Sequence, residues 1–159
     1  MNKITRNVVA CLIGLSIISC TKVPITGRKQ LKLLPDSMMA EMGQTNYAAF
    51  LKENPAVSPP TRQSAEVTAV GLRISKAVEK YMKDNNLSQK IAGYKWEFNV
   101  VDSKEVNAWC MPGGKVVVYT GILPLTKDDA GLAVVMGHEI AHAIADHGNE
   151  RMSQELAVQ

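Results

Sequence analysis

The sequence has no apolar run long enough to cross a bilayer. Its most apolar stretch, Val8 to Ile18, is shorter than the ~20 residues that a transmembrane helix needs. Lys3 and Arg6 precede that stretch, and the first nineteen residues contain no acidic residue. This pattern predicts that residues 1–19 are an export signal and favours that interpretation over a permanent membrane-spanning anchor.

Cysteine is also scarce, with three residues in the chain. Ile17-Ile18-Ser19-Cys20 resembles a bacterial lipobox, in which Cys20 becomes the lipidated first residue of the mature protein. A plain secretory signal with an incidental cysteine is the alternative interpretation. Cys11 would leave with the signal, so Cys110 has no partner and a disulfide framework is excluded. Its apolar neighbours predict that Cys110 is a small buried hydrophobe and not a nucleophile.

Neither positive nor negative charge is in large excess. The sequence also has no internal repeat, low-complexity tract or heptad series. The formal net charge is +3, and two of the positive charges belong to the predicted signal. Such a balance implies no nucleic-acid partner. The hydrophobic fraction of 46% is that of a globular domain with a real core.

Hydrophobic periodicity predicts two helices and three strands after a short N-terminal segment. Residues 20–35 contain a proline and a glycine and are expected to form an extended tether or a turn. Apolar residues at helical spacing predict helices over about 36–52 and 62–84, separated by a proline-rich loop. Alternation of apolar and polar residues at 96–100 predicts a strand. Two further strands, 107–111 and 115–119, are predicted to form a hairpin around the turn Pro112-Gly113-Gly114. A further helix is expected to start at a Thr126 cap and to run through the histidines described next.

The chemistry of the chain centres on His138-Glu139-Ile140-Ala141-His142. Positions four apart share one face of a helix, so His138 and His142 can point two imidazoles at one metal ion, and zinc suits them. Glu139 lies beside the open coordination position and is the natural general base for a metal-activated water. A chance match on a surface helix is the competing interpretation. The apolar residues around the motif predict a mostly buried helix, in which such polar groups need partners.

No residue that follows the motif is a convincing third ligand. At 100° per residue on a continuing helix, His147 faces away from the metal, which favours a structural or hydrogen-bonding role. Asp146 lies on about the right face but two turns beyond His138. Ala145 and Gly148 occupy the positions where a metzincin has glycine and histidine.

Several motifs together resemble metallopeptidase family forty-eight, the gluzincins related to the CAAX prenyl protease and the heat-shock membrane protease, and specifically its bacterial lipoprotein branch. The matching segments span most of the mature chain: Pro24-Ile25-Thr26-Gly27-Arg28-Lys29-Gln30-Leu31, Asn107-Ala108-Trp109-Cys110-Met111-Pro112-Gly113-Gly114, Val118-Tyr119-Thr120-Gly121-Ile122-Leu123, and Gly137-His138-Glu139-Ile140-Ala141-His142 extended to His147.

The resemblance implies an α+β, zincin-like fold with N-terminal helices and a small antiparallel sheet or hairpin packed on the helix of the histidine motif. It implies Zn²⁺ as cofactor, bound by His138 and His142, with Glu139 catalytic. Family members take their third zinc ligand from a glutamate on a later helix, which is not found before Gln159. We therefore expect residues 36–159 to be the N-terminal part of a metallopeptidase domain whose C-terminal part is missing, and the 159-residue chain to bind zinc weakly and cleave little.

By the same resemblance, the hairpin borders the substrate cleft and holds an extended peptide by strand addition. The expected substrate-binding residues are Asn107, Ala108, Gly113, Gly114, Val116 and Val118. The expected function is a lipid-anchored zinc metalloendopeptidase for protein quality control, which hydrolyses unfolded or misassembled envelope proteins. Thr21 after the lipidated Cys20 favours the outer membrane, facing the periplasm. The alternative is a non-catalytic lipoprotein that binds unfolded or partner proteins through the same cleft.

Overall fold

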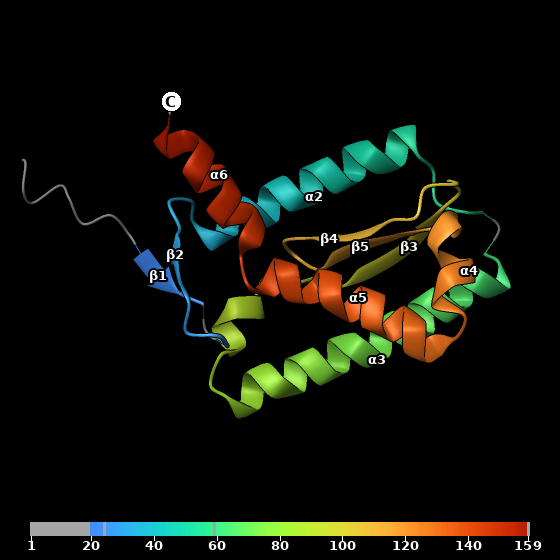
Figure 1. Cartoon of the computed structure of the whole chain (residues 1–159), viewed down its shortest axis with the longest axis horizontal. Coiled ribbons are helices and arrows are strands. Elements are labelled where there is room, and N and C mark those ends of the chain that lie inside the picture. Colours follow the sequence, from blue (N-terminus) through green and yellow to red (C-terminus); the bar gives the residue numbers. More distant parts are fainter. Residues whose placement is uncertain (1–19, 24, 59, 159) are drawn as a thin grey trace, which may run out of the picture.

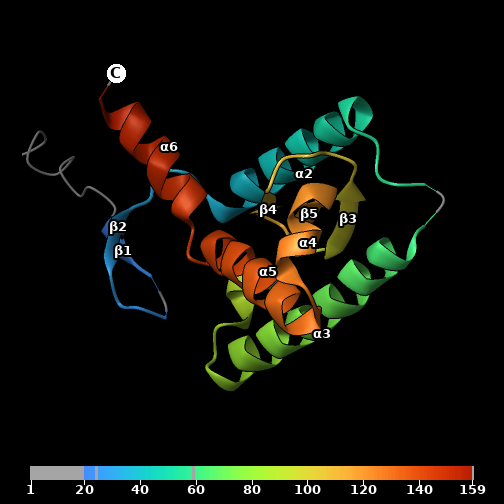
Figure 2. The same cartoon turned by 45° about the vertical axis from the view of Figure 1, so that its right-hand side comes forward.

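The chain folds into three layers, with a small central sheet between two layers of helices. The computed structural model describes residues 20–23, 25–58 and 60–158, so the predicted signal segment 1–19 lies outside the described residues. The sheet contains β3 (Glu97–Val101), β4 (Ala108–Met111) and β5 (Lys115–Tyr119). Helix α2 (Asp36–Glu53) covers one face, and α3 (Arg62–Asp84) and α5 (Asp129–Ile144) cover the other (Figures 1 and 2).

Strand β5 occupies the centre of the sheet, because its side chains are apolar on both faces. The sheet order is β3-β5-β4. Val116 and Val118 pack toward α3 and α5, whereas Val117 and Tyr119 pack toward α2. Val116, Val117 and Val118 are all 0% exposed. Only a strand with neighbours on both sides can bury its residues so completely.

The sheet is mixed, which corrects the expectation of an antiparallel one. Strand β4 pairs with β5 antiparallel, as the hairpin sequence predicted, but β3 pairs with β5 in parallel. The reason is that β5 inserts between β3 and β4, which follow each other in the sequence and run in opposite directions. The α+β class, the two helices and the three strands are confirmed to within one or two residues at their ends.

The turn between β4 and β5 needs both glycines for their backbone angles, and it needs Gly114 for space as well. Gly113 and Gly114 have φ angles of 89° and 81°, which residues with side chains rarely adopt. A Cβ on Gly114 would also lie 2.8 Å from the Trp96 ring. On the other side of the turn, a Cβ on Gly43 of α2 would lie 2.3 Å from the Pro112 carbonyl oxygen. The hairpin is therefore held tightly between α2 and Trp96.

The structure also shows how the histidine helix begins. Asp128, and not Thr126, caps α5, because its side chain accepts a hydrogen bond from the Gly131 backbone N–H at 2.9 Å. Thr126 instead ends the short helix α4 (Leu123–Thr126), and Lys127 adopts a φ of 65° in the turn between the two helices. The cap predicted at Thr126 therefore lies two residues too early, at the residue that ends α4.

The N-terminal segment is a small hairpin that packs on the C-terminal helix. Strand β1 (Cys20–Lys22) pairs antiparallel with β2 (Lys29–Leu31). The hairpin lies beside α6 (His147–Ala157), and the Leu33 backbone N–H donates to Ser153 Oγ of that helix at 2.9 Å (Figure 2). The extended strands and the turn agree with the sequence prediction. In addition, contacts to α6 hold this segment against the domain, which a free tether would not show.

None of the helices in the described part of the chain has the length and hydrophobicity required to cross a bilayer.

Substitution of Gly43 tests how tightly α2 packs on the hairpin. Gly43→Ala is expected to destabilise the fold by about 1–3 kcal/mol, because the new methyl group would overlap the Pro112 carbonyl. Denaturant unfolding measures the effect. The matched control is Gly137→Ala, a helical glycine with nothing within 4 Å of the added Cβ, which is expected to stabilise by up to about 1 kcal/mol. Equal midpoints for the two variants would contradict the close approach.

Candidate active site

The three histidines of the chain lie together at the end of α5. His138 Nε2 is 2.9 Å from His142 Nε2, and His142 Nδ1 is 2.5 Å from His147 Nδ1. All three residues are exposed. The first pair follows from helical spacing, as the sequence predicted, whereas the second pair does not.

The sequence prediction placed His147 on a continuing helix, facing away from the metal, but the helix does not continue and His147 contacts His142. Helix α5 ends at Ile144, and α6 begins at His147 after Asp146 adopts the left-handed conformation, with φ 59° and ψ 28°. Aspartate tolerates that conformation better than most residues. Asp146 and Gly148, two residue types typical of helix ends, flank His147 and were the signal in the sequence that could have predicted the break.

Ion pairs hold the break in place. The Asp146 carboxylate pairs with Lys32 at 2.8 Å and with Lys90, and all three side chains are nearly buried. On the next turn of α6, Arg28 donates two hydrogen bonds to the Glu150 carboxylate, at 2.7 and 2.5 Å. The Arg28 hydrogen bond keeps the pKa of Glu150 below its usual value. Residues 28–32 therefore fix the orientation in which α6 leaves α5.

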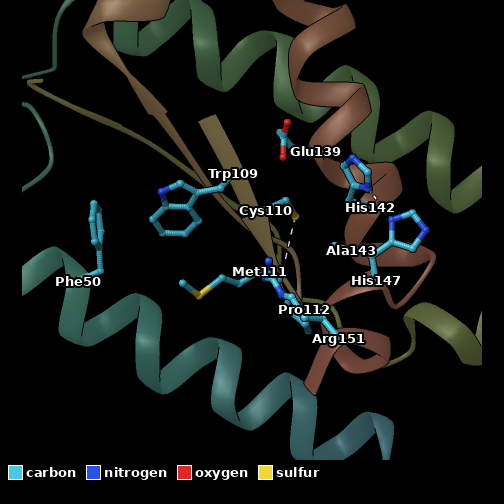
Figure 3. A pocket seen from close by; sticks show the side chains of 11 residues that line it. Phe50, Trp109, Cys110, Met111, Pro112, Glu139, His142, Ala143, His147 and Arg151 are labelled. Carbon is cyan, nitrogen blue, oxygen red and sulfur yellow. Dashed lines mark hydrogen bonds between the residues drawn. The ribbon is translucent and has the colours of Figure 1, made fainter. Parts of the chain in front are cut away.

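A cavity of about 740 Å³ lies between α5 and β4, beside two of the histidines. In Figure 3, Glu139 and His142 border it on the α5 side, and Trp109 and Met111 face them from β4. Phe50 of α2 extends the apolar wall, with its ring 4.9 Å from that of Trp109. The cavity is also lined by Cys110, Pro112, Ala143, His147, Gly148 and Arg151. The sequence patterns gave no indication that Phe50, Trp109, Met111 or Arg151 would line the site.

Glu139 also borders a second cavity, of about 330 Å³, farther along β4. Val106, Asn107 and Ala108 line it together with Val134 and His138 of α5. The two cavities follow β4 in succession, one beside residues 106–108 and one beside residues 109–112, and Glu139 lines both; together they are called the groove below. Val134 is 73% exposed, so α5 is buried on one face only and the sequence prediction of a mostly buried helix is wrong.

Strand β4 offers its backbone to this groove, because it is an edge of the sheet. Tyr119 N–H donates to the Asn107 carbonyl, so the ladder bonds of β4 continue at Trp109 and Met111, which face β5. The N–H and C=O groups of Ala108 and Cys110 point the other way. Among the described residues, no strand lies beside them.

Four of the six predicted substrate-binding residues do not line the groove. Val116 and Val118 are 0% exposed in the central strand, and Gly113 and Gly114 are buried in the hairpin turn. The prediction failed because it placed the whole hairpin at the cleft, although only its first strand has a free edge. Asn107 and Ala108 do line the groove.

The histidines are suited to a metal ion by their chemistry, but incompletely. A tetrahedral zinc ion with Zn–N bonds of about 2.0–2.1 Å holds two nitrogens roughly 3.3 Å apart, so His138 and His142 need to open by only a few tenths of an ångström. Within residues 20–23, 25–58 and 60–158, no group of three or more His, Cys, Asp or Glu side chains is arranged to hold a metal ion. A catalytic zinc site usually has three protein ligands, so the two histidines would account for two of them.

Two further titratable groups border the groove. Desolvation, and then the charge of Glu139, raises the pKa of the Cys110 thiol to about 12. Desolvation, followed by repulsion from His142, lowers the pKa of His147. Cys110 is therefore protonated at neutral pH and is not the nucleophile of the site, in agreement with the sequence prediction.

Alkylation measures the reactivity of Cys110. At about pH 8, a thiol of pKa about 12 has roughly a thousandfold less thiolate than an ordinary cysteine, so iodoacetamide is expected to label Cys110 correspondingly slowly. Mass spectrometry of the Cys110 peptide gives the rate, and the same chain unfolded in denaturant is the control. Similar rates in the folded and unfolded chain would contradict the burial of this thiol.

Comparisons with known proteins agree with this geometry. Residues 70–159 match the family model described as Peptidase family M48. The chain is 35% identical over 132 residues to "Metalloendopeptidase OMA1, mitochondrial" of Bos taurus, covering 82% of this chain and 24% of the relative. It is 29% identical over 161 residues to "Mitochondrial metalloendopeptidase OMA1" of Saccharomyces cerevisiae, covering 97% of this chain and 46% of the relative.

A bacterial relative is similar over most of the chain as well. The chain is 27% identical over 147 residues to "Metalloprotease YcaL" of Escherichia coli, covering 89% of this chain and 57% of the relative. The chain spans between 17% and 46% of the length of four OMA1 relatives that it matches.

Proposed function

Because the chain belongs to peptidase family M48, we propose that it carries the catalytic helix and substrate groove of a zinc-dependent metalloendopeptidase. The observation that carries the proposal is the position of Glu139. Its side chain borders both cavities of the groove along β4, next to two imidazoles whose Nε2 atoms are 2.9 Å apart. His138 and His142 are the proposed zinc ligands and Glu139 is the proposed general base.

The proposed division of labour follows from these positions. Zinc held by His138 and His142 would supply a Lewis acid that polarises the peptide carbonyl and promotes loss of a proton from the attacking water. The Glu139 carboxylate accepts a proton from the attacking water and passes it to the departing amine nitrogen. Each histidine would bind the ion through an unprotonated ring nitrogen. Their exposed position on α5 leaves room for a peptide above them.

The substrate is proposed to be an extended segment of an unfolded or misassembled protein. An extended peptide can add to the free edge of β4 by hydrogen bonds to Ala108 and Cys110, which require no particular side chain. The walls of the groove are apolar at both ends, with Phe50, Trp109 and Met111 at one and Val106 and Val134 at the other. Folded proteins bury such extended apolar segments, which favours unfolded chains as substrates.

Attachment to a membrane through a lipid on Cys20 is part of the same proposal. Strand β1 starts at Cys20, and Ile25 and Thr26 of the following turn line a cavity of about 210 Å³ together with His138, His142 and His147. A lipid at Cys20 would therefore place the groove close to the membrane surface. The outer membrane of a bacterial envelope, facing the periplasm, is the proposed location, and envelope proteins are the proposed clients.

A non-catalytic binding function is the second candidate. It is favoured by the number of metal ligands, since the described residues offer two histidines and no third group in place. The edge of β4 and its apolar walls would then hold unfolded segments without cleaving them.

The Glu139→Gln substitution separates the two functions. In the full-length protein, we expect zinc-dependent cleavage of an unfolded protein such as reduced casein, and a loss of roughly a hundredfold to ten-thousandfold in kcat for Glu139→Gln. Glu105→Gln, an exposed residue outside the groove, is the matched control. Cleavage retained in Glu139→Gln would refute the catalytic proposal. Equal client binding with and without a chelator, in the absence of any cleavage, would favour the binding function.

Binding at the edge of β4 can be tested through one backbone N–H. Ala108→Pro removes a donor that faces the groove and not β5, so the sheet should persist while KM rises roughly three- to tenfold, the equivalent of one hydrogen bond. Ala108→Ser keeps the N–H and is the control. Melting temperatures check that both variants fold, and an unchanged KM in the proline variant would rule out this register of substrate binding.

A further inference from the structure

His147 lies at the Nδ1 edge of the His142 ring, opposite the Nε2 edge that faces His138. Their Nδ1 atoms are 2.5 Å apart, and the ring centroids are 4.7 Å apart. On the opposite side of the same ring, His142 Nε2 faces His138 Nε2 at 2.9 Å. His142 is thus contacted by a different histidine at each of its two ring nitrogens.

These contacts restrict the tautomers of the rings. A neutral imidazole carries one proton, on either Nδ1 or Nε2. The nitrogen that binds a metal must be unprotonated, so a metal at Nε2 of His142 requires the proton on Nδ1. That Nδ1–H points at His147 Nδ1, which can accept it only if His147 carries its own proton on Nε2.

We propose that His147 is a positioning residue that accepts a hydrogen bond from Nδ1–H of His142 and thereby keeps Nε2 of His142 free to bind metal. The identity of the metal ion as zinc rests on the proposed function. Groups that hold a metal-binding histidine in this way fix both the tautomer and the ring orientation.

Direct metal binding by His147 does not fit the same geometry. Its nearest nitrogen approaches Nδ1 of His142, and the lone pairs of Nδ1 and Nε2 diverge from the imidazole ring. An ion held between the Nε2 atoms of His138 and His142 therefore lies across the ring from His147. The lack of a three-ligand group among the described residues agrees with this placement.

The surrounding structure holds His147 in this position at some conformational cost. The left-handed Asp146 turns the chain so that His147 comes back toward His142, and Lys32 and Lys90 bind the Asp146 carboxylate. Asn149, which is 1% exposed, donates from Nδ2 to the Leu34 carbonyl at 2.7 Å and fixes the first turn of α6. Both sets of contacts hold the start of α6, and with it His147, against the segment 32–34 and Lys90.

Two substitutions distinguish a hydrogen-bond acceptor from mere bulk. In His147→Asn, the side-chain Oδ1 takes the place of Nδ1 and can still accept from His142. In His147→Ala, no acceptor remains. Circular dichroism and melting temperature establish that both variants keep the fold.

The direct measurement is the tautomer of His142 in the metal-free chain, by ¹⁵N NMR of the imidazole at about pH 8, where free histidine is neutral. We expect Nδ1–H in the native chain and in His147→Asn, and a shift toward Nε2–H in His147→Ala. Predominant Nε2–H in the native chain, or unchanged Nδ1–H in His147→Ala, would overturn the proposal.

The second measurement is Zn²⁺ affinity by competition with a chromogenic chelator. His147→Ala is expected to bind Zn²⁺ roughly 10–100-fold more weakly than the native chain, and His147→Asn is expected to stay close to the native affinity. Equal affinity in His147→Ala, or equal loss in both variants, would overturn the proposal. Neither readout depends on proteolysis, so a protein that never cleaves a substrate would refute the proposed function and leave this inference standing.

Discussion

The burial of β5 on both faces is the constraint from which the rest of the fold follows. Three consecutive valines with no exposed surface require a helical layer on each side and a strand along each edge. That arrangement leaves β4 at an edge and brings α5 across the face that carries Val116 and Val118. Leu132, Met136, Ile140 and Ile144 of α5 pack into the same core, so the opposite side of α5 carries the histidines. The core therefore determines where the histidines and the free strand edge meet.

The break between α5 and α6 adds what the core alone does not determine. A continuous helix would have carried His147 away from His142, as counting residues around a helix predicted. The left-handed Asp146 reverses this, and its carboxylate is held by Lys32 and Lys90 from two distant parts of the chain. Burial of one acidic and two basic side chains is tolerated because each is paired.

Sequence patterns predicted the parts of the structure that depend on local periodicity. The bounds of α2 and α3, the hairpin around Pro112-Gly113-Gly114 and the pairing of His138 with His142 all follow from residues close together in the chain. The parallel pairing of β3 with β5 was missed, because strand order depends on contacts between segments that periodicity does not relate. The same limitation explains why Val116 and Val118 were assigned to the cleft, and why the break at Asp146, which Lys32 and Lys90 hold, was not anticipated.

The contacts between the N-terminal hairpin and α6 also have a consequence for the order of folding. Arg28 and Glu150 are separated by 122 positions, and Leu33 and Ser153 by 120. Contacts of such long sequence separation close large loops and form slowly compared with helices and hairpins. Among the described elements α6 is synthesised after all the others, so the contact of His142 with His147 forms only once the rest of the described chain has been made. Before α6 docks on the N-terminal hairpin, the chain therefore carries His138, Glu139 and His142 on one helix without the contact that His147 makes with His142.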